Sequence, residues 1–151
     1  MAKGIFDSPI GRLIIEADDS GILALDFDRN GESYADDHPL LTRAFEELQA
    51  YFEGKLVTFS VPLNPKGTSF QKSVWEVLRT IPYGETISYS DEAQKLHHPK
   101  ATRAVANANG KNKIAIMIPC HRVIAKNGGI GGYSGGLWRK EYLLALEAKY
   151  R

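Results

Sequence analysis

The sequence contains a single cysteine and no long apolar segment. Cys120 is the one cysteine among 151 residues, so the chain can form neither an internal disulfide nor a zinc site built from several cysteines. No apolar run reaches the length of a membrane span, and residues 1–21 lack the apolar core of a signal peptide. We therefore expect a cytoplasmic protein that does not bind membranes.

Acidic residues are missing from one long stretch of the chain. Residues 93–140 contain nine Lys and Arg but no Asp or Glu, whereas residues 1–92 contain sixteen acidic residues against eight basic ones. A segment of this kind is typical of a surface that meets polyanions such as nucleic acid. The alternative is a basic face that only balances the acidic part of the chain. The net charge of +1 argues against unselective coating of nucleic acid, but it permits a local site.

The first third of the sequence predicts a small sheet and one helix. Apolar runs on both sides of residues 18–21 predict a β-hairpin with a turn at Gly21. Apolar residues at helical spacing over residues 38–53 predict a helix that Gly54 ends. Residues 56–63 predict a further strand that is closed by Pro62. The linker that follows, residues 64–68, divides the chain into an N-terminal lobe, 1–64, and a C-terminal lobe, 68–151.

The C-terminal lobe is predicted to be mostly helical. Two capping-box patterns, Thr68 with Gln71 and Ser88 with Asp91, each predict the start of a helix. Pro99 suits the first position of a third helix over residues 99–109. Two short helices joined by a tight turn indicate a helix-turn-helix. The alanines of the last helix would let its backbone approach another surface closely, although core packing explains them equally well.

The sequence around Cys120 is typical of a reactive thiol. The apolar residues 113–118 predict a buried strand, which Pro119 ends, so that Cys120 would lie at the strand terminus. The adjacent His121 and Arg122 would supply positive potential, which lowers a thiol pKa. The loop 126–136 that follows contains six glycines and would let a ligand approach backbone amides. The alternative is that Cys120 is a small core residue, since free cysteine is often buried.

Glu147 is a candidate partner for His121. It lies four residues after Leu143 and three after Leu144, so it leans toward the side of the last helix that those leucines would bury. A carboxylate there could orient a histidine and complete a Cys–His–Glu set. The alternative is an exposed glutamate that pairs with Arg151. At this point a cysteine hydrolase that acts on a small substrate is also consistent with the residues.

Four segments resemble the O6-alkylguanine-DNA alkyltransferase family. They are "GTSFQKSVWEVLRTIPYGETISYSDEA", "ATRAVANANGKN", "IPCHRVIAKNGGIGGYSGGL" and "KEYLLALE", which all lie between residues 67 and 147, and the "PCHRV" core is the most diagnostic. The resemblance implies an α+β fold with a ribonuclease H-like N-terminal lobe and a winged helix-turn-helix-like C-terminal lobe. It also implies direct-reversal DNA repair, in which O6-alkylguanine is flipped out of duplex DNA and its alkyl group passes irreversibly to Cys120. The enzyme would be a methylated-DNA–[protein]-cysteine S-methyltransferase that acts once.

The resemblance further implies a role for each matching residue. Cys120 would be the acceptor, His121 the base acting through a water, and Glu147 the group that orients the histidine. Asn112 would brace the loop before the cysteine, and Tyr89 would lie beside the target phosphate and the guanine edge, where we expect it to protonate the leaving guanine. Arg103 would enter the base stack from the minor groove. Further DNA contacts are expected from Lys100, Ala101, Thr102, Ala104 and Arg122, and the guanine pocket from Tyr89, Cys120, Val123, Tyr133, Ser134 and Gly135.

The sequence departs from the family pattern in one place and leaves one alternative function. Lys113 follows Asn112 where many members have proline, which would loosen the brace. Some relatives have a structural zinc in the N-terminal lobe, but we expect no metal here, because the chain has no second cysteine and only His38 in that lobe. We also expect no cofactor. We expect a monomer whose partner is double-stranded DNA containing O6-alkylguanine. The alternative is a non-catalytic protein that binds alkyl lesions as a sensor. A hydrolase is disfavoured by the helix-turn-helix and the acid-free segment.

Overall fold

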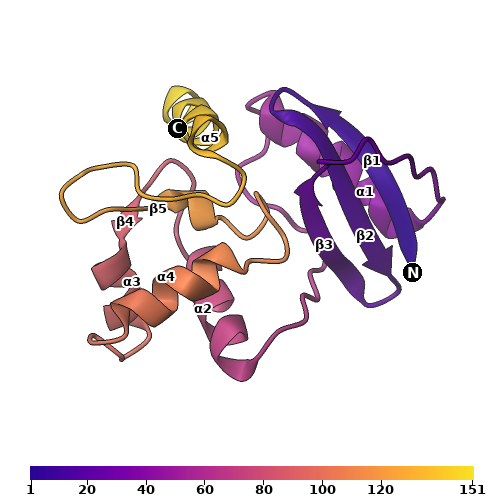
Figure 1. The fold of residues 1–151 in the computed structure, drawn as a ribbon. Coiled ribbons are helices and arrows are strands. Elements are labelled where there is room, and N and C mark those ends of the chain that lie inside the picture. The colour runs from indigo at the N-terminus through magenta and orange to yellow at the C-terminus, as the bar shows by residue number, and fades with distance from the viewer. The chain divides into compact units, whose positions relative to one another are not determined.

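The computed structural model describes residues 1–151, which form two compact units. The N-terminal unit comprises Met1–Lys66 and Lys113–Ala115, and the C-terminal unit comprises Gly67–Asn112 and Ile116–Arg151. Three antiparallel strands belong to the first unit and four of the five α-helices to the second (Figure 1). The predicted α+β class is confirmed.

The N-terminal unit is a three-stranded sheet with one helix against it. Strands β1 (Ala2–Ser8), β2 (Gly11–Asp18) and β3 (Gly21–Phe27) follow one another in space as in sequence. The turn between β2 and β3 lies where the hairpin was predicted. Alternate residues of β2 point into the core, and Leu13 and Ile15 are fully buried. Helix α1 (Pro39–Phe52) covers one face of the sheet (Figure 1).

Helix α1 is confirmed, but the strand predicted after it is wrong. The buried stripe of α1 consists of Leu41, Ala44, Leu48 and Tyr51. Residues 56–63 form only an isolated bridge between Leu63 and Ile22. The Glu47 carboxylate accepts hydrogen bonds from the backbone N–H groups of Ser60 and Val61, at 3.0 and 3.1 Å. The Glu47 side chain thus satisfies backbone N–H groups that would otherwise have paired with a neighbouring strand.

The C-terminal unit is built around helix α2 and a helix-turn-helix. Its elements are α2 (Ser69–Arg79), β4 (Ile87–Ser88), α3 (Tyr89–Lys95), α4 (Thr102–Gly110), the 3-10 turn η1 (Cys120–Arg122), β5 (Val123–Ile124) and α5 (Leu137–Tyr150). Both predicted capping boxes are present, at the starts of α2 and α3. The buried indole of Trp75 donates a hydrogen bond of 2.9 Å to the carbonyl of Ala108, which fixes α2 against α4.

Helix α4 begins later than predicted. Pro99 lies in the turn between α3 and α4, and Ala101 is the cap of α4. His97 has a left-handed backbone with φ 62°, and the Ala101 N–H donates to the carbonyl of His98 at 2.9 Å. These two features close a turn that uses the residues expected in the first helical turn.

Residues 114–118 are buried, as predicted, whereas Lys113 is exposed, and residues 113–118 do not form a strand. Ile114, Ala115, Ile116, Met117 and Ile118 are all 9% exposed or less. Only Ile114 pairs with a strand residue, Leu25, and Ile116 has φ 72°, which turns the chain. Leu25 uses its one N–H and one carbonyl on residues 113 and 115, so the pairing stops there. Cys120 therefore starts the turn η1 and does not end a strand.

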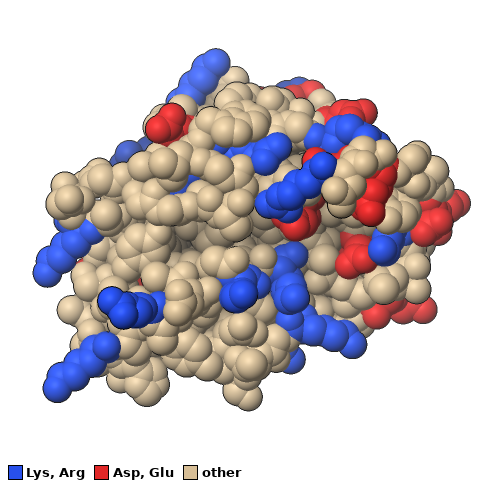
Figure 2. Space-filling model, in the orientation of Figure 1, with Lys and Arg blue, Asp and Glu red and all other residues tan.

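The two units differ in surface charge. On the face shown in Figure 2, acidic side chains gather over the N-terminal unit, whereas the C-terminal unit presents mainly Lys and Arg. Arg103 and Lys100, at the start of α4, are both exposed. The acid-free segment of the sequence thus presents cations at one end of the second helix of the helix-turn-helix.

Candidate active site

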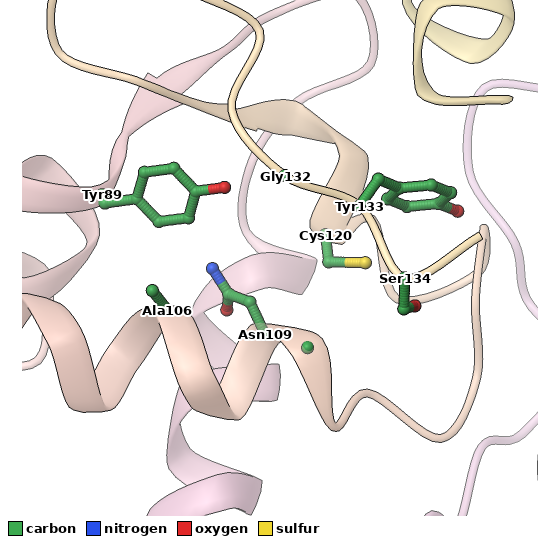
Figure 3. A pocket seen from close by; sticks show the side chains of 8 residues that line it. Tyr89, Ala106, Asn109, Cys120, Gly132, Tyr133 and Ser134 are labelled. Atoms are coloured by element: carbon green, nitrogen blue, oxygen red, sulfur yellow. The ribbon is translucent and has the colours of Figure 1, made fainter. Parts of the chain in front are cut away.

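A cavity of about 410 Å³ lies in the C-terminal unit, next to Cys120. It is lined by Tyr89, Ala106, Asn109, Gly110, Cys120, Gly132, Tyr133 and Ser134. Figure 3 shows the Tyr89 ring on one side and the thiol of Cys120 near Tyr133 and Ser134 on the other. Helix α3, helix α4, the turn η1 and the glycine-rich loop therefore meet around one thiol.

The thiol of Cys120 is poorly exposed, and burial controls its ionisation. The residue is 9% exposed. Burial raises the pKa of the Cys120 thiol, while a hydrogen bond from Asn112 and the charge of Lys140 act in the opposite direction. The prediction that His121 and Arg122 lower this pKa is wrong, because other residues lower it. Arg122 is neutralised by Glu147, and the cation that acts on the thiol is Lys140.

Lys140 is a buried cation that joins the glycine-rich loop to the strand after the cysteine. Its ammonium group donates to the carbonyls of Val123 at 2.6 Å and Gly132 at 3.0 Å, and the residue is fully buried. Burial lowers its pKa, and the nearby thiol of Cys120 opposes that decrease. Sequence reasoning missed this residue. Its position at the end of the acid-free segment was visible, but nothing in its spacing indicated burial.

His121 and Glu147 form a buried pair, as the sequence suggested. The Nε2 atom of His121 lies 2.7 Å from Oε2 of Glu147, and both residues are almost completely buried. Because a carboxylate only accepts, Nε2 must carry the proton. Burial lowers the pKa of His121 despite the neighbouring carboxylate, so the imidazole is neutral. Its Nδ1 atom is buried without a hydrogen-bond partner and is therefore available as a base.

Arg122 holds Glu147 and is not offered to DNA. Its guanidinium donates from Nε and Nη2 to the two carboxylate oxygens of Glu147, at 2.8 and 3.0 Å, and from Nη1 to the Ile81 carbonyl at 2.7 Å. Arg122 is 6% exposed, so the expected DNA contact is corrected. These bonds, together with the one to His121, hold the pKa of Glu147 far below its usual range although burial alone would raise it. The alternative pairing of Glu147 with Arg151 is not present.

Tyr89 is placed by the capping box of α3 and covered by the glycine-rich loop. It is the first residue of α3, directly after the cap Ser88. A side chain at Gly131 would lie 2.9 Å from the Tyr89 hydroxyl, so only glycine lets the loop pass this close. Burial raises the pKa of Tyr89, and a hydrogen bond from the Gly132 backbone opposes this. The phenol therefore keeps its proton at neutral pH.

Asn112 lies where the family pattern places the brace. Its side-chain amide donates to the carbonyl of Ile118 at 2.8 Å, two residues before Cys120. The contact forms although Lys113 follows.

Several predicted residues lie outside the cavity. Val123 and Gly135 are buried but do not line it, and Arg103 and Ala104 are exposed on α4, with Ala101 and Thr102 partly exposed at its start.

Three residues of α4 that line the cavity were not predicted from the sequence: Ala106, Asn109 and Gly110. Their spacing of three and four residues puts them on one helix face, which was a usable signal.

The sequence matches two family models. The description "6-O-methylguanine DNA methyltransferase, ribonuclease-like domain" applies to residues 1–65, and "6-O-methylguanine DNA methyltransferase, DNA binding domain" applies to residues 69–149. The chain belongs to the O6-methylguanine-DNA methyltransferase family. The family resemblance and the two kinds of lobe predicted from the sequence are thereby confirmed.

Relatives of this methyltransferase family match along nearly the whole chain. The methylated-DNA–protein-cysteine methyltransferase of Methanosarcina acetivorans is 45% identical over 97% of this chain and 98% of its own. That of Haemophilus influenzae is 41% identical over 94% and 83%. A crystal structure of Mycobacterium tuberculosis OGT in complex with DNA is 43% identical, covers 99% of this chain and 94% of that chain, and superposes with a TM-score of 0.92.

Proposed function

We propose that this protein repairs O6-alkylguanine in double-stranded DNA by moving the alkyl group to its own cysteine. The observation that supports this most directly is the single thiol, Cys120, which lines a cavity next to a neutral, Glu147-bound His121. Membership of the methyltransferase family assigns the reaction type, which is direct reversal by alkyl transfer to cysteine. The protein acts once, because a thioether on Cys120 is not hydrolysed.

The transfer step can be written with the residues of this site. Nδ1 of His121 takes the thiol proton through one water, and the thiolate attacks the alkyl carbon while the carbon–O6 bond breaks. Tyr89 donates a proton to the departing guanine and regains one from the imidazolium. The thiol proton thus ends on guanine, and sulfur ends with the alkyl group. Lys140 and Asn112 favour the thiolate, which burial alone would disfavour.

We assign the guanine pocket to the cavity beside Cys120. The backbone carbonyls of Cys120 and Val123 accept from the guanine amine, while Ser134 lies near O6. The Val123 carbonyl also accepts from Lys140 at 2.6 Å, and its second lone pair leaves room for both donors. Tyr133 and Ser134 form the outer wall, and Gly135, which does not itself line the cavity, follows them in the glycine-rich loop.

We assign DNA binding to the exposed start of α4. Arg103 fills the space of the extruded base from the minor groove, and Lys100, Ala101, Thr102 and Ala104 contact the backbone close by. Phosphate contacts carry no sequence information, which suits a protein that must act in any sequence context. In this proposal residues 1–64 are a scaffold, residues 68–151 bind DNA as a monomer, and neither metal nor cofactor takes part.

The test is the intact mass of the protein after mixing with a duplex that carries one O6-methylguanine, followed by peptide mapping. One added methyl group on Cys120, stopping at one per molecule, is expected. Tight lesion binding without any mass change would identify a non-catalytic sensor, and repeated turnover would identify a hydrolase. Cys120→Ser is the matched control, because it keeps the cavity but removes the nucleophile.

The proposed proton donation by Tyr89 has a separate test. Tyr89→Phe keeps the ring and removes the hydroxyl, so transfer from the methylated duplex should slow while alkylation of Cys120 by iodoacetamide is unchanged. Single-turnover kinetics by rapid mixing measure the rate of transfer from the methylated duplex. A Tyr89→Phe protein that transfers at the wild-type rate would contradict the assignment.

A further inference from the structure

A buried carboxyl group lies behind the cavity and has no place in the reaction described above. Glu92 belongs to α3 and is 0% exposed. Its Oε1 atom accepts one hydrogen bond, of 2.7 Å, from the side-chain amide of Asn109 on α4, and its Oε2 atom is buried without a partner. A buried carboxylate with half of its hydrogen-bonding capacity unused is costly, so a simple structural role explains it poorly.

Glu92 reaches the cavity through Asn109. Asn109 is 7% exposed, lines the cavity with Cys120 and Tyr89, and leaves its own Oδ1 atom buried without a partner. Figure 3 shows its amide between the Tyr89 ring and the thiol. The hydrogen bond from Asn109 to Glu92 is therefore what fixes this part of the cavity wall.

No cation compensates the charge of Glu92. Helix α2, which packs against α3, has only exposed charges at Lys72, Glu76 and Arg79, while β4 and β5 have none. On α3 itself Asp91 and Lys95 are exposed, and on α4 the single charged residue, Arg103, is exposed as well. The titratable groups that sense Glu92 inside the unit are Tyr89 and Cys120.

We propose that Glu92 is a positioning residue for alkyl transfer, which holds Asn109 in the cavity wall and must be neutral for Cys120 to react at its full rate. This inference rests on the proposed function, because it concerns the same thiol. The protonated carboxyl group keeps an acceptor oxygen for Asn109 but adds no negative charge next to the site. The ionised group keeps the same hydrogen bond and opposes the thiolate.

The electrostatics of the site give the direction of the effect. Burial raises the pKa of Glu92 to about 7, and only the hydrogen bond from Asn109 opposes this. Ionised Glu92 raises the pKa of both Cys120 and Tyr89. As the pH rises through about 7, Glu92 ionises and the thiol becomes harder to deprotonate. Because the pKa of the thiol is itself raised above its ordinary value, Glu92 ionises first, and the logarithm of the thiolate fraction should rise less steeply with pH near pH 7 than below or above it.

The experiment uses the single cysteine as its own reporter. Because Cys120 is the only thiol, the rate of alkylation by iodoacetamide against pH measures its thiolate fraction without DNA. Glu92→Gln removes the charge and keeps the acceptor for Asn109. We expect the apparent thiol pKa to fall by roughly half a unit or more and the shallower slope near pH 7 to disappear. Glu76→Gln, on the exposed face of α2, is the matched control and should follow the wild type.

A second variant separates the charge from the positioning. Glu92→Leu removes the charge and also the acceptor for Asn109. Its Cys120 thiol should therefore titrate like that of Glu92→Gln. Transfer from a methylated duplex should be at least about tenfold slower than in Glu92→Gln, because one positioning hydrogen bond is lost. Equal transfer rates in the two variants would overturn the positioning role.

The wild-type profile keeps the proposal testable if neither variant folds. A wild-type profile whose slope does not change near pH 7, or superimposable profiles for wild type and Glu92→Gln, would overturn the inference. The iodoacetamide profile does not depend on DNA repair. A protein that shows the coupling but transfers nothing from the duplex would contradict the proposed function alone.

Discussion

At the scale of single residues, the site depends on which cation acts on the thiol. The sequence places His121 and Arg122 next to Cys120, and adjacency suggested that both lower the thiol pKa. In the structure the Arg122 charge is neutralised by the Glu147 carboxylate, and His121 is neutral. Lys140, twenty positions further along the chain, takes that role. Adjacent residues in a tight turn point in different directions, so sequence adjacency could not reveal the pairing.

Lys140→Met tests this assignment. The change removes the cation that favours the thiolate, so the pKa of Cys120 should rise further. We expect alkylation by iodoacetamide at neutral pH to slow by about tenfold, which corresponds to one pKa unit. Lys126→Met, in the same acid-free segment but exposed, is the control. An unchanged rate in Lys140→Met would show that Asn112 alone balances the burial of the thiol.

The other site residues differ in how far the sequence could predict them. Cys120, His121 and Glu147 could be predicted from the sequence, because a strong motif and helical spacing indicated them. The structure brings His121 and Glu147 together. The roles of Asn109 and Glu92 could not be predicted from the sequence. Their pairing joins two helices, and a glutamate in a capping-box turn is ordinarily exposed.

At the scale of elements, local signals predicted starts of helices better than strands. Both capping boxes form, because each is a hydrogen-bond pattern complete within four residues. The strands predicted at 56–63 and 113–118 do not form, because a strand needs a partner with free backbone groups. Leu25 offers only one such pair to the second segment, and Glu47 replaces the ladder in the first. In residues 114–118 the apolar run therefore predicted burial correctly and a strand incorrectly, whereas in residues 56–63 only Val61 is buried.

The late start of α4 bears on how the helix would meet DNA. Arg103 is the second residue of the helix and is exposed, with the alanines beside it leaving its stem uncovered. Arg103→Ala should slow transfer from a methylated duplex by about tenfold or more, the cost of one lost charged contact, because nothing would fill the emptied stack. Transfer from the free base, which needs no extrusion, should be unchanged.

Comparison of the two substrates in single-turnover assays measures this difference. Lys111→Ala, at the other end of α4, controls for loss of charge on the same helix. Equal losses on the duplex and on the free base would mean that Arg103 supports the fold of the cavity and has no special part in extrusion.

At the scale of the whole molecule, alkylation should lower stability. Cys120 is only 9% exposed although it lines the cavity, so we expect the alkyl group that stays after guanine leaves to press on the residues beside the thiol. Overpacking of this kind costs about 1–3 kcal/mol. We expect the fully methylated protein to melt at a lower temperature than the free protein, in calorimetry after complete reaction. A melting temperature that is equal or higher would show that the cavity accommodates the group without strain.

Three buried groups, Glu147, His121 and Glu92, make the free energy of unfolding depend on pH below about 7, and Glu92 acts in the opposite direction to the other two. The folded-state pKa of Glu147 is lowered, so its contribution is present above its ordinary value near 4.5 and is lost as the pH falls. The lowered pKa of His121 acts in the same direction below 6.5. Glu92 is the reverse case. Its pKa is raised to about 7, so the fold loses stability as the pH rises from 4.5 to about 7.

Glu92→Gln isolates the part of this dependence that Glu92 causes. Relative to the wild type, the variant should gain stability as the pH rises from 4.5 through 7, by on the order of 3 kcal/mol in the free energy of unfolding. Both proteins retain Glu147 and His121, so the acid losses cancel in the difference between the two curves. Urea unfolding at a series of pH values measures that difference. A difference that stays constant over this range would mean that Glu92 is ionised in the folded protein at its ordinary pKa, and that the burial around it is relieved by water.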